Sequence, residues 1–363
     1  MPNLLSRLLS TPSPDRVDAA FSLRGLLRQN AALARHYLWD CNRLPVGAAP
    51  LWLHFGCGER VLEGFTNLDF IPHDARVLAW NLLDRWPDVV NRAEGIFSED
   101  VLEHFFYPEQ AYILCNWNRI LRGGRLARVL MPSLAKLVAH REGYAPQPGE
   151  FLADTFGVET GGDALNMGMR FSGHRWLHDQ ASLATLAGAC GFEALPTACA
   201  KSAEPKFDGL NIRDETNSLS FANDLRKVRH VERLTVQPGA IEGAERIEEV
   251  ADGIALYVAV RDRPTVDFAP SARLAVEAVP CINLFSSNLS SFAEHNLKSL
   301  QLDGGAPWFF DETLKSRPAV NIVPRNQLRL AAAGRADFGA LRFSPAAAAG
   351  EYFTLGCAEI FVA

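Results

Sequence analysis

The chain has 363 residues, enough for two domains, and a net charge of −6 at pH 7. This charge argues against a nucleic-acid substrate, because phosphate binding favours a basic face. Seven cysteines without a C-x-x-C pair indicate a reducing compartment rather than a disulfide framework. With no apolar run of eighteen residues and an N-terminus too interrupted for a signal peptide, we expect a cytoplasmic protein without a membrane span.

Residues 1–48 are predicted to form an N-terminal helical cap. Leucines share one helical face near residues 4–9, and again near 26–38, with a proline-containing break at Thr11–Pro14 between them. Such helices would cover the sheet or a partner subunit, or form a lid over the substrate.

The most informative segment follows this cap. The apolar run Leu51–Phe55 ends at Gly56–Gly58, which is typical of a buried parallel strand that turns beneath a nucleotide-like ligand. A second run ends at Asp69, where a carboxylate can hold ribose hydroxyls. Only thirteen residues (69 − 56) separate Gly56 from this acid, too few for the crossover helix and strand of a dinucleotide fold. Val61 also replaces the third glycine of that fingerprint, and no P-loop follows.

Strands and helices are then predicted to alternate to about residue 225, which indicates an α/β domain with a doubly wound parallel sheet. Further strands are expected at 77–80, 95–97 and 121–132. A helix is expected to begin at Asp100, which has the capping-box spacing to Glu103, and another at Asp179.

Five segments in this order resemble the class I S-adenosylmethionine-dependent methyltransferases, and more narrowly the type-11-like branch associated with glycan biosynthesis. They are His54–Gly58, Thr66–Asp69, Asp100–His104, Leu121–Gly124 and Gly173–Asp179. The resemblance covers residues 50–225 and implies a Rossmann-like methyltransferase domain, which we place at 49–262. It also implies S-adenosyl-L-methionine as the cofactor.

The resemblance further implies which residues bind this cofactor. Gly56 and Gly58 would let the backbone approach its methionine part, and Asp69 would bind the ribose diol. The remaining residues that it assigns to the cofactor site are His54, Cys57, Asn81, Leu82 and Ser98. Asn81 stands where an aspartate is usual, and the loop 81–96 lacks the usual proline and phenylalanine turn.

Methyl transfer to a sugar hydroxyl requires a general base, typically worth about 10²–10⁴ in rate, whereas a carboxylate acceptor does not need one. The candidates are Asp100, His104 and His174. Each has a structural alternative, since Asp100 would cap a helix and either histidine can be a packed structural residue. We expect no metal, because His174 and His178 lack neighbouring ligands at zinc spacing.

From residue 263 to 363 helical periodicity gives way to short β runs separated by glycine and proline, which predicts an all-β sandwich as a second domain. The runs 231–236 and 254–260 are assigned to the first domain as extra strands. Trp308–Phe310 would either stack on a sugar or fill the sandwich core.

The sequence thus predicts a cytoplasmic methyltransferase that acts on a hydroxyl of a sugar or glycan precursor. A second copy of the chain or an envelope-biosynthesis protein is the partner considered. Two alternatives stay open. One is a carboxyl or small-molecule methyltransferase, and the other is a non-catalytic, glycan-binding scaffold on a methyltransferase fold.

Overall fold

The computed structural model divides the chain into two compact units, Met1–His230 and Val231–Ala363. The residues it describes are 42–45, 50–143, 158–170, 173–212, 219–251, 253–288, 298–310, 325–328 and 336–363. The predicted helical cap lies outside them except for 42–45, as do the side chains of Trp308–Phe310.

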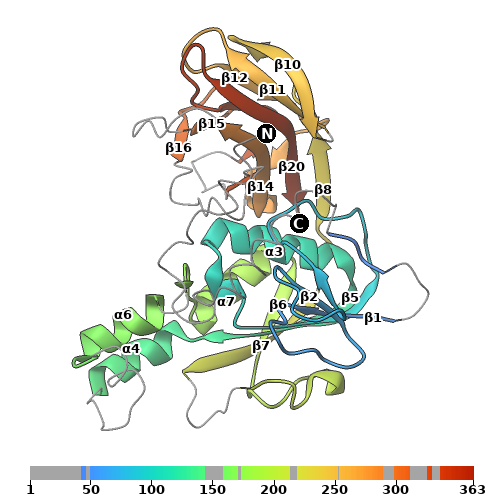
Figure 1. Ribbon diagram of the computed structural model, residues 1–363, viewed down its shortest axis with the longest axis vertical. Coiled ribbons are helices and arrows are strands. Elements are labelled where there is room, and N and C mark those ends of the chain that lie inside the picture. The colour runs from blue at the N-terminus through green and yellow to red at the C-terminus, as the bar shows by residue number, and fades with distance from the viewer. Residues whose placement is uncertain are drawn as a thin grey trace. The chain divides into compact units, whose positions relative to one another are not determined.

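The first unit contains a seven-stranded sheet in the order β3-β2-β1-β4-β5-β7-β6. Figure 1 labels β1, β2, β5, β6 and β7 of this sheet. Its strands are β1 Leu51–Phe55, β2 Thr66–Asp69, β3 Val77–Ala79, β4 Ala93–Glu99, β5 Leu121–Pro132, β6 Phe192–Thr197 and β7 Ser220–Lys227. The first five strands are parallel, and β7 is antiparallel to both β5 and β6. The chain runs outward from β1 to β3 and then returns to place β4 on the other side of β1, so the strand order reverses between β1 and β4. In doubly wound sheets this switch point is where ligands bind, outside the carboxyl ends of the strands.

One face of this sheet packs against an aromatic cluster. Phe55 of β1 stacks on Trp117 with 5.6 Å between ring centroids, and Trp80 and Trp86 pack against the same phenylalanine. Trp117 belongs to helix α3 (Tyr107–Ile120), which is almost entirely buried beyond its first turn. Because β1 and β4 are covered on both faces, they are buried over almost their whole length, and only Trp52 and Glu99 are partly exposed.

The opposite face is covered by a loop that contains the short 3-10 helix η3 (Pro205–Phe207). Phe207 is fully buried and meets Trp52 edge to face, with 5.6 Å between centroids. Gly95 of β4 makes this packing possible, since a Cβ there would lie 2.5 Å from the Trp52 ring and 2.7 Å from that of Phe207. The other helices of this unit are α4 Leu134–Gly143, α6 Gly161–Arg170 and α7 Gln180–Ala189.

The sequence predicted that helices begin at Asp100 and at Asp179, and the structure tests both predictions. Asp179 is the N-cap of α7, and its Oδ1 accepts from the Ser182 amide at 2.8 Å, which confirms the prediction. The prediction that a helix begins at Asp100 was wrong. Asp100 has a φ of +54°, which a right-handed helix excludes, and only the single 3-10 turn η1 (Leu102–His104) follows it. Helix α3 begins instead at Tyr107, where Glu109 accepts from the Phe106 amide.

The second unit is built from antiparallel sheets. One contains β10 Ala244–Ala251, β11 Ile254–Ala259, β20 Tyr352–Val362, β14 Cys281–Asn288, β17 Arg325–Leu328 and β8 Glu232–Val236. Another contains β16 Trp308–Phe310, β15 Lys298–Leu302, β19 Leu341–Ser344, β12 Thr265–Phe268 and β9 Ile241–Glu242. A small pair joins β13 Leu274–Ala275 to β18 Asp337–Phe338, and the 3-10 helix η4 (Val276–Ala278) follows β13.

These sheets share one hydrophobic core. Tyr257 of β11 and Phe353 of β20 stack at 5.5 Å between centroids, and Phe268 and Phe343 of the other sheet belong to the same core. The unit begins at Val231, earlier than the boundary expected between 262 and 263. The reason is that β8 and β11 both pair with β20, the last strand of the chain, rather than extending the first sheet. Among the described residues, no helix has the length and apolarity needed to cross a membrane.

Candidate functional site

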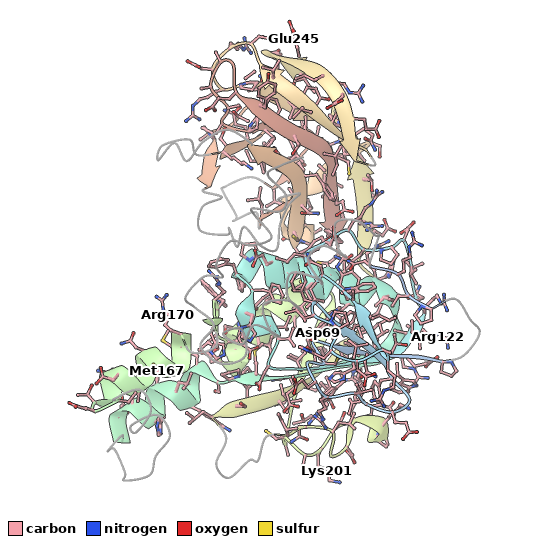
Figure 2. The ribbon with its side chains drawn as sticks, viewed as in Figure 1. Asp69, Arg122, Met167, Arg170, Lys201 and Glu245 are labelled. Atoms are coloured by element: carbon pink, nitrogen blue, oxygen red, sulfur yellow. The ribbon has the colours of Figure 1, made fainter. Side chains whose placement is uncertain are left out.

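The loop after β1 and the acid at the end of β2 are joined by backbone hydrogen bonds. The amides of Gly56 and Cys57 donate to the Leu68 carbonyl at 2.8 and 3.3 Å. The Gly58 amide donates to Asp69 Oδ2 at 2.8 Å, and the Ile71 amide donates to Asp69 Oδ1 at 2.8 Å. The half-buried carboxylate, labelled in Figure 2, is therefore fixed at the carboxyl edge of the sheet, and each oxygen keeps a lone pair for a further donor.

The two glycines of this loop serve different purposes. Both have positive φ, +65° at Gly56 and +53° at Gly58, which side chains rarely adopt. A Cβ at Gly56 would lie 2.2 Å from Cγ2 of Val101, so this glycine makes room for the segment after β4. A Cβ at Gly58 would meet no atom of the described residues within 4 Å. Gly58 therefore leaves its space open beside Asp69, as close backbone approach to a ligand requires.

The electrostatics of the loop keep its cysteine neutral. Burial, and next the negative charge of Asp69, raise the pKa of the Cys57 thiol to about 12. At neutral pH this thiol is protonated and is not a nucleophile.

Ser98, one of the predicted cofactor residues, lies at the switch point itself. It pairs with Phe55 across β1 and β4, and its side chain is 1% exposed. Within the part of the chain that the structure describes, the Ser98 hydroxyl has no hydrogen-bond partner. Buried hydroxyls usually have one, so a bound ligand at this edge would find a donor and acceptor ready.

Asn81 and Leu82 follow β3, as expected, and both are buried. The backbone amide and carbonyl of Asn81 are bound by the side chain of Asn42, at 2.9 Å each. The Asn81 Oδ1 accepts from the Leu83 amide, and the Leu82 carbonyl accepts from the Trp86 indole. The polar groups of this loop are therefore hydrogen-bonded within the chain. Its role beside the adenine stays a prediction. Asn42 carried no signal in the sequence that would have placed it here.

His54 is used inside the sheet. Its Nδ1 lies 3.0 Å from Oδ1 of Asn67, and its ring packs 5.2 Å from that of Phe97. Burial lowers the pKa of His54 to about 4, so the ring is neutral at physiological pH. The predicted cofactor contact of this side chain has no support in its placement.

The three predicted acceptor-side residues fall near the end of β4, and two of them meet. The rings of His104 and His174 lie edge to face with 5.2 Å between centroids, although 70 residues (174 − 104) separate them in sequence. The amides of Arg175 and Trp176 donate to the Glu103 carbonyl at 2.6 and 3.2 Å, which fastens the His174 segment to η1. Asp100 precedes this turn, and its amide donates to the Leu130 carbonyl of β5.

Sequence reasoning missed the residue that holds these segments together. Gln110 of α3 is fully buried, and its amide nitrogen lies within 3.1 Å of the carbonyls of Leu102, Phe105 and Trp176. Its oxygen accepts from Nε2 of His178 at 2.7 Å. Burial lowers the pKa of His178 to about 4, and its Nδ1 lies 2.8 Å from the Ser182 hydroxyl. His178 is thus a neutral structural histidine, and no local pattern could have revealed its partner in α3.

Another missed group is Glu99, the last residue of β4. Its carboxylate accepts from the Ile212 amide at 3.1 and 3.2 Å and from Arg60 at 3.2 Å, and its side chain is 6% exposed. Glu99 therefore binds the β1 loop and the segment around 212 to the same edge of the sheet.

No family model and no curated protein matches this chain. Solved structures similar to it include an O-methyltransferase family protein from Burkholderia thailandensis, with 13% identity over 62% of this chain and 68% of that one and a TM-score of 0.33. Another is phosphoethanolamine N-methyltransferase 2 of Haemonchus contortus bound to S-adenosylhomocysteine, with 13% identity over 57% and 54% and a TM-score of 0.30. A third is the xylan-binding module CBM86 of Roseburia intestinalis, with 10% identity over 36% and 95% and a TM-score of 0.25. These likenesses are too distant to assign a function to this chain.

The chain's own sheet order, with its switch point between β1 and β4, confirms the Rossmann-like sheet that the sequence predicts. The residues at that point also fit an adenosyl cofactor. The two carboxylate oxygens of Asp69 can accept hydrogen bonds, and the backbone of Gly58 has open space beside it. The Ser98 hydroxyl is buried without a hydrogen-bond partner among the described residues.

Proposed function

We propose that this protein transfers a methyl group from S-adenosyl-L-methionine to a hydroxyl of a sugar or glycan precursor. The observation that carries the proposal is the Gly58–Asp69 pair at the switch point. The amide of Gly58 holds the Asp69 carboxylate by a hydrogen bond, and the same glycine leaves space for a ligand. The cofactor supplies the activated methyl, and the protein supplies orientation and exclusion of water.

In this proposal Asp69 holds the ribose hydroxyls, because a fixed carboxylate with spare lone pairs is suited to two adjacent donors. Gly58 admits the methionine part, and the Ser98 hydroxyl adds a polar contact at the same edge. The rebuilt loop at Asn81 and Leu82 flanks the adenine. Cys57 contributes its backbone and a neutral surface, in keeping with its raised pKa.

The acceptor hydroxyl would be deprotonated by Asp100 or His104, which follow β4, or by His174, whose ring packs against that of His104. Val101 connects the two regions, since it packs where a side chain of Gly56 would otherwise lie. A carboxylate acceptor would need no base, so the loss of rate on replacing these residues separates the two classes of substrate.

For the second unit we propose a β-sandwich that holds the glycan. Two antiparallel sheets around one core support this architecture. The proposed setting is the cytoplasm, with a second copy or an envelope-biosynthesis protein as partner.

Calorimetry with S-adenosyl-L-methionine tests the cofactor. We expect the wild-type protein to bind and Asp69→Asn to bind at least about tenfold more weakly, since a hydrogen bond to a charged group contributes about 1.5–3 kcal/mol. Asp74→Asn is the matched control, because Asp74 lies in the loop after the same strand and pairs with the exposed Arg76. Its affinity should equal that of the wild type.

The absence of heat from the wild-type protein at millimolar cofactor would overturn the proposal. That result would favour the scaffold alternative, which the Asn42 contacts around Asn81 keep open. Where binding is found, incubation with methyl-labelled cofactor and a panel of nucleotide sugars and glycan extracts, read by mass spectrometry, identifies the acceptor.

A further inference from the structure

We infer that Glu103, His104 and His174 form a binding site for one divalent transition-metal ion. A carboxylate oxygen of Glu103 and one ring nitrogen of each histidine all lie within 4.8 Å of one another. In a tetrahedral site with bonds of about 2.0–2.2 Å from zinc to nitrogen and oxygen, two ligand atoms lie roughly 3.3–3.6 Å apart. Closing these separations by up to about 1.5 Å, shared among the three side chains, therefore brings the cluster to bonding distance.

The hydrogen bonding of His174 prepares one nitrogen for a metal. Its Nδ1 lies 3.0 Å from the carbonyl oxygen of Gly168 in α6. A carbonyl only accepts hydrogen bonds, so Nδ1 carries the proton and Nε2 keeps its lone pair. Metal-binding histidines usually donate their second nitrogen to a carbonyl or carboxylate in this way, which fixes both the tautomer and the ring orientation.

The backbone around the cluster is fixed independently of any ion. The Glu103 carbonyl accepts from the amides of both Arg175 and Trp176, the two residues that follow His174. The Gln110 amide bridges the carbonyl of Leu102 to that of Trp176. The two segments that carry the three side chains are thus joined at their main chains, as a preformed site requires.

The chemistry of the three side chains selects the kind of ion. Glu103 is fully buried, and buried carboxylates in proteins are paired with cations or bound to metals. Two imidazoles and one carboxylate suit zinc or iron(II), whereas magnesium and calcium prefer oxygen ligands alone. Three protein ligands also leave a coordination position open.

Binding of the ion does not depend on the proposed methyl transfer, but the two bear on each other. A histidine nitrogen that ligates a metal has no lone pair with which to accept a proton. An occupied site therefore leaves Asp100 as the base among the three candidates. Binding of an ion here would overturn the expectation of no metal, which considered only His174 and His178 and not the ligands that η1 supplies.

Titration of the chelator-treated, full-length protein with Co²⁺, without any cofactor, tests the site. We expect one equivalent to bind with visible d–d absorption, and Zn²⁺ to displace it. Glu103→Gln, which keeps the shape of the side chain, and His174→Ala should each weaken binding at least about tenfold. His140→Ala removes a histidine of α4 outside the cluster and should bind as the wild type does.

Circular dichroism shows whether each variant is folded. X-ray absorption of the zinc-loaded wild-type protein, which needs no variant, should show two imidazole ligands. Failure of Co²⁺ and Zn²⁺ to bind at a several-fold excess, or binding that persists in His174→Ala, would overturn the inference. Because these measurements omit S-adenosyl-L-methionine, their failure is distinct from a failure of the proposed function.

Discussion

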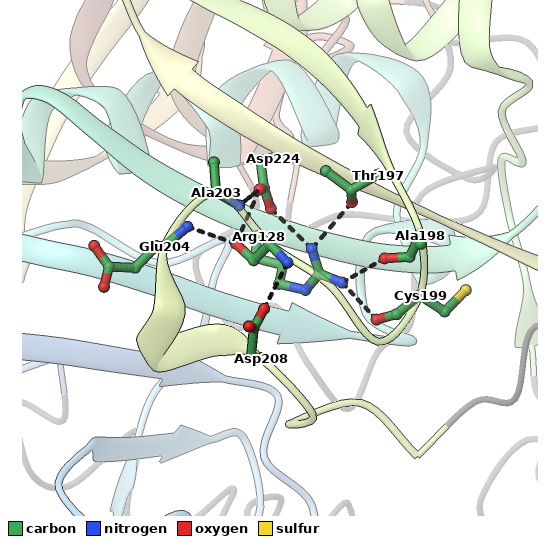
Figure 3. A network of polar contacts seen from close by, with 9 residues as sticks. Arg128, Thr197, Ala198, Cys199, Ala203, Glu204, Asp208 and Asp224 are labelled. Atoms are coloured by element: carbon green, nitrogen blue, oxygen red, sulfur yellow. Dashed lines mark hydrogen bonds and ion pairs between the residues drawn. The ribbon is translucent and has the colours of Figure 1, made fainter.

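Removal of the Arg128 guanidinium should destabilise the first unit more than any surface ion pair does. Arg128 of β5 and Asp224 of β7 are both fully buried, with 2.9 Å between Nη1 and Oδ1 (Figure 3). Arg128 also donates to Thr197 and to the carbonyls of Ala198 and Cys199. In Arg128→Met the stem is kept but Asp224 is left as a buried charge, which typically costs about 3–5 kcal/mol.

Two other donors limit this cost. The Ser202 hydroxyl and the Ala203 amide donate to Asp224 Oδ2 at 2.9 and 2.7 Å, so the carboxylate is not stripped of all partners. We therefore expect about 3 kcal/mol rather than 5. For a unit of this size that lowers the melting temperature by roughly 6–12 °C. Urea unfolding followed by tryptophan fluorescence measures it, because all tryptophans except Trp308 lie in the first unit.

The matched control lies on the neighbouring pair of strands, β7 and β6. Arg226 of β7 donates to Glu193 of β6 through both Nε and Nη2, but the two side chains are 46% and 48% exposed. Exposed pairs of this kind contribute about 0–1 kcal/mol, so Arg226→Met should change the unfolding midpoint little. Equal losses in the two variants, or a loss below 1 kcal/mol for Arg128→Met, would refute the reasoning that burial sets the cost.

Two further predictions concern the loop after β1, at Gly56–Gly58, and the buried histidines His54 and His178. Gly58→Ala and Gly124→Ala each place a methyl group at a positive φ, with no described atom within 4 Å, so each should cost about 1–2 kcal/mol of stability. Only Gly58→Ala should raise the dissociation constant of S-adenosyl-L-methionine, by at least about tenfold in calorimetry. An equal rise in both variants would contradict the assignment of Gly58 to the cofactor site. Because burial lowers the pKa of His54 and of His178 to about 4, below the usual 6.5, unfolding binds protons and stability is lost as the pH falls from 6.5 towards 4. Each histidine contributes up to about 3 kcal/mol to this loss, so the urea midpoint should fall between pH 7 and pH 5, and an unchanged midpoint would contradict it.

The sequence predicted five of the seven strands of the first sheet, because apolar runs and glycine turns mark their ends, but it named neither β6 nor β7. Leu51–Phe55 and Thr66–Asp69 have the expected bounds. What it could not predict depends on distant partners. The β8 strand reads like any other strand, and only its pairing with the last strand of the chain assigns it to the second unit.

In the candidate site, too, the local features could be predicted from the sequence and the contacts between distant segments could not. The pairing of Gly58 with Asp69 is local and could be expected from their spacing. The meeting of His104 with His174 requires the loop before α7 to return to η1, which is set by backbone bonds to the Glu103 carbonyl. The capping-box interpretation of Asp100 and Glu103 failed because the positive φ of Asp100 is a backbone feature that a polar side chain does not reveal.

Gly56 links the cofactor loop to the histidine cluster, and this leads to a last prediction. Val101 occupies the space in which a Cβ of residue 56 would lie, at 2.2 Å from its Cγ2, and Val101 is the residue from which the η1 turn begins. Gly56→Ala should therefore displace η1 together with Glu103 and His104, and weaken both S-adenosyl-L-methionine and Co²⁺ binding. Gly58→Ala, whose methyl meets no such neighbour, should weaken only the former. Calorimetry and Co²⁺ absorption on the two variants measure the difference, and unchanged Co²⁺ binding in Gly56→Ala would show that the two regions are held independently.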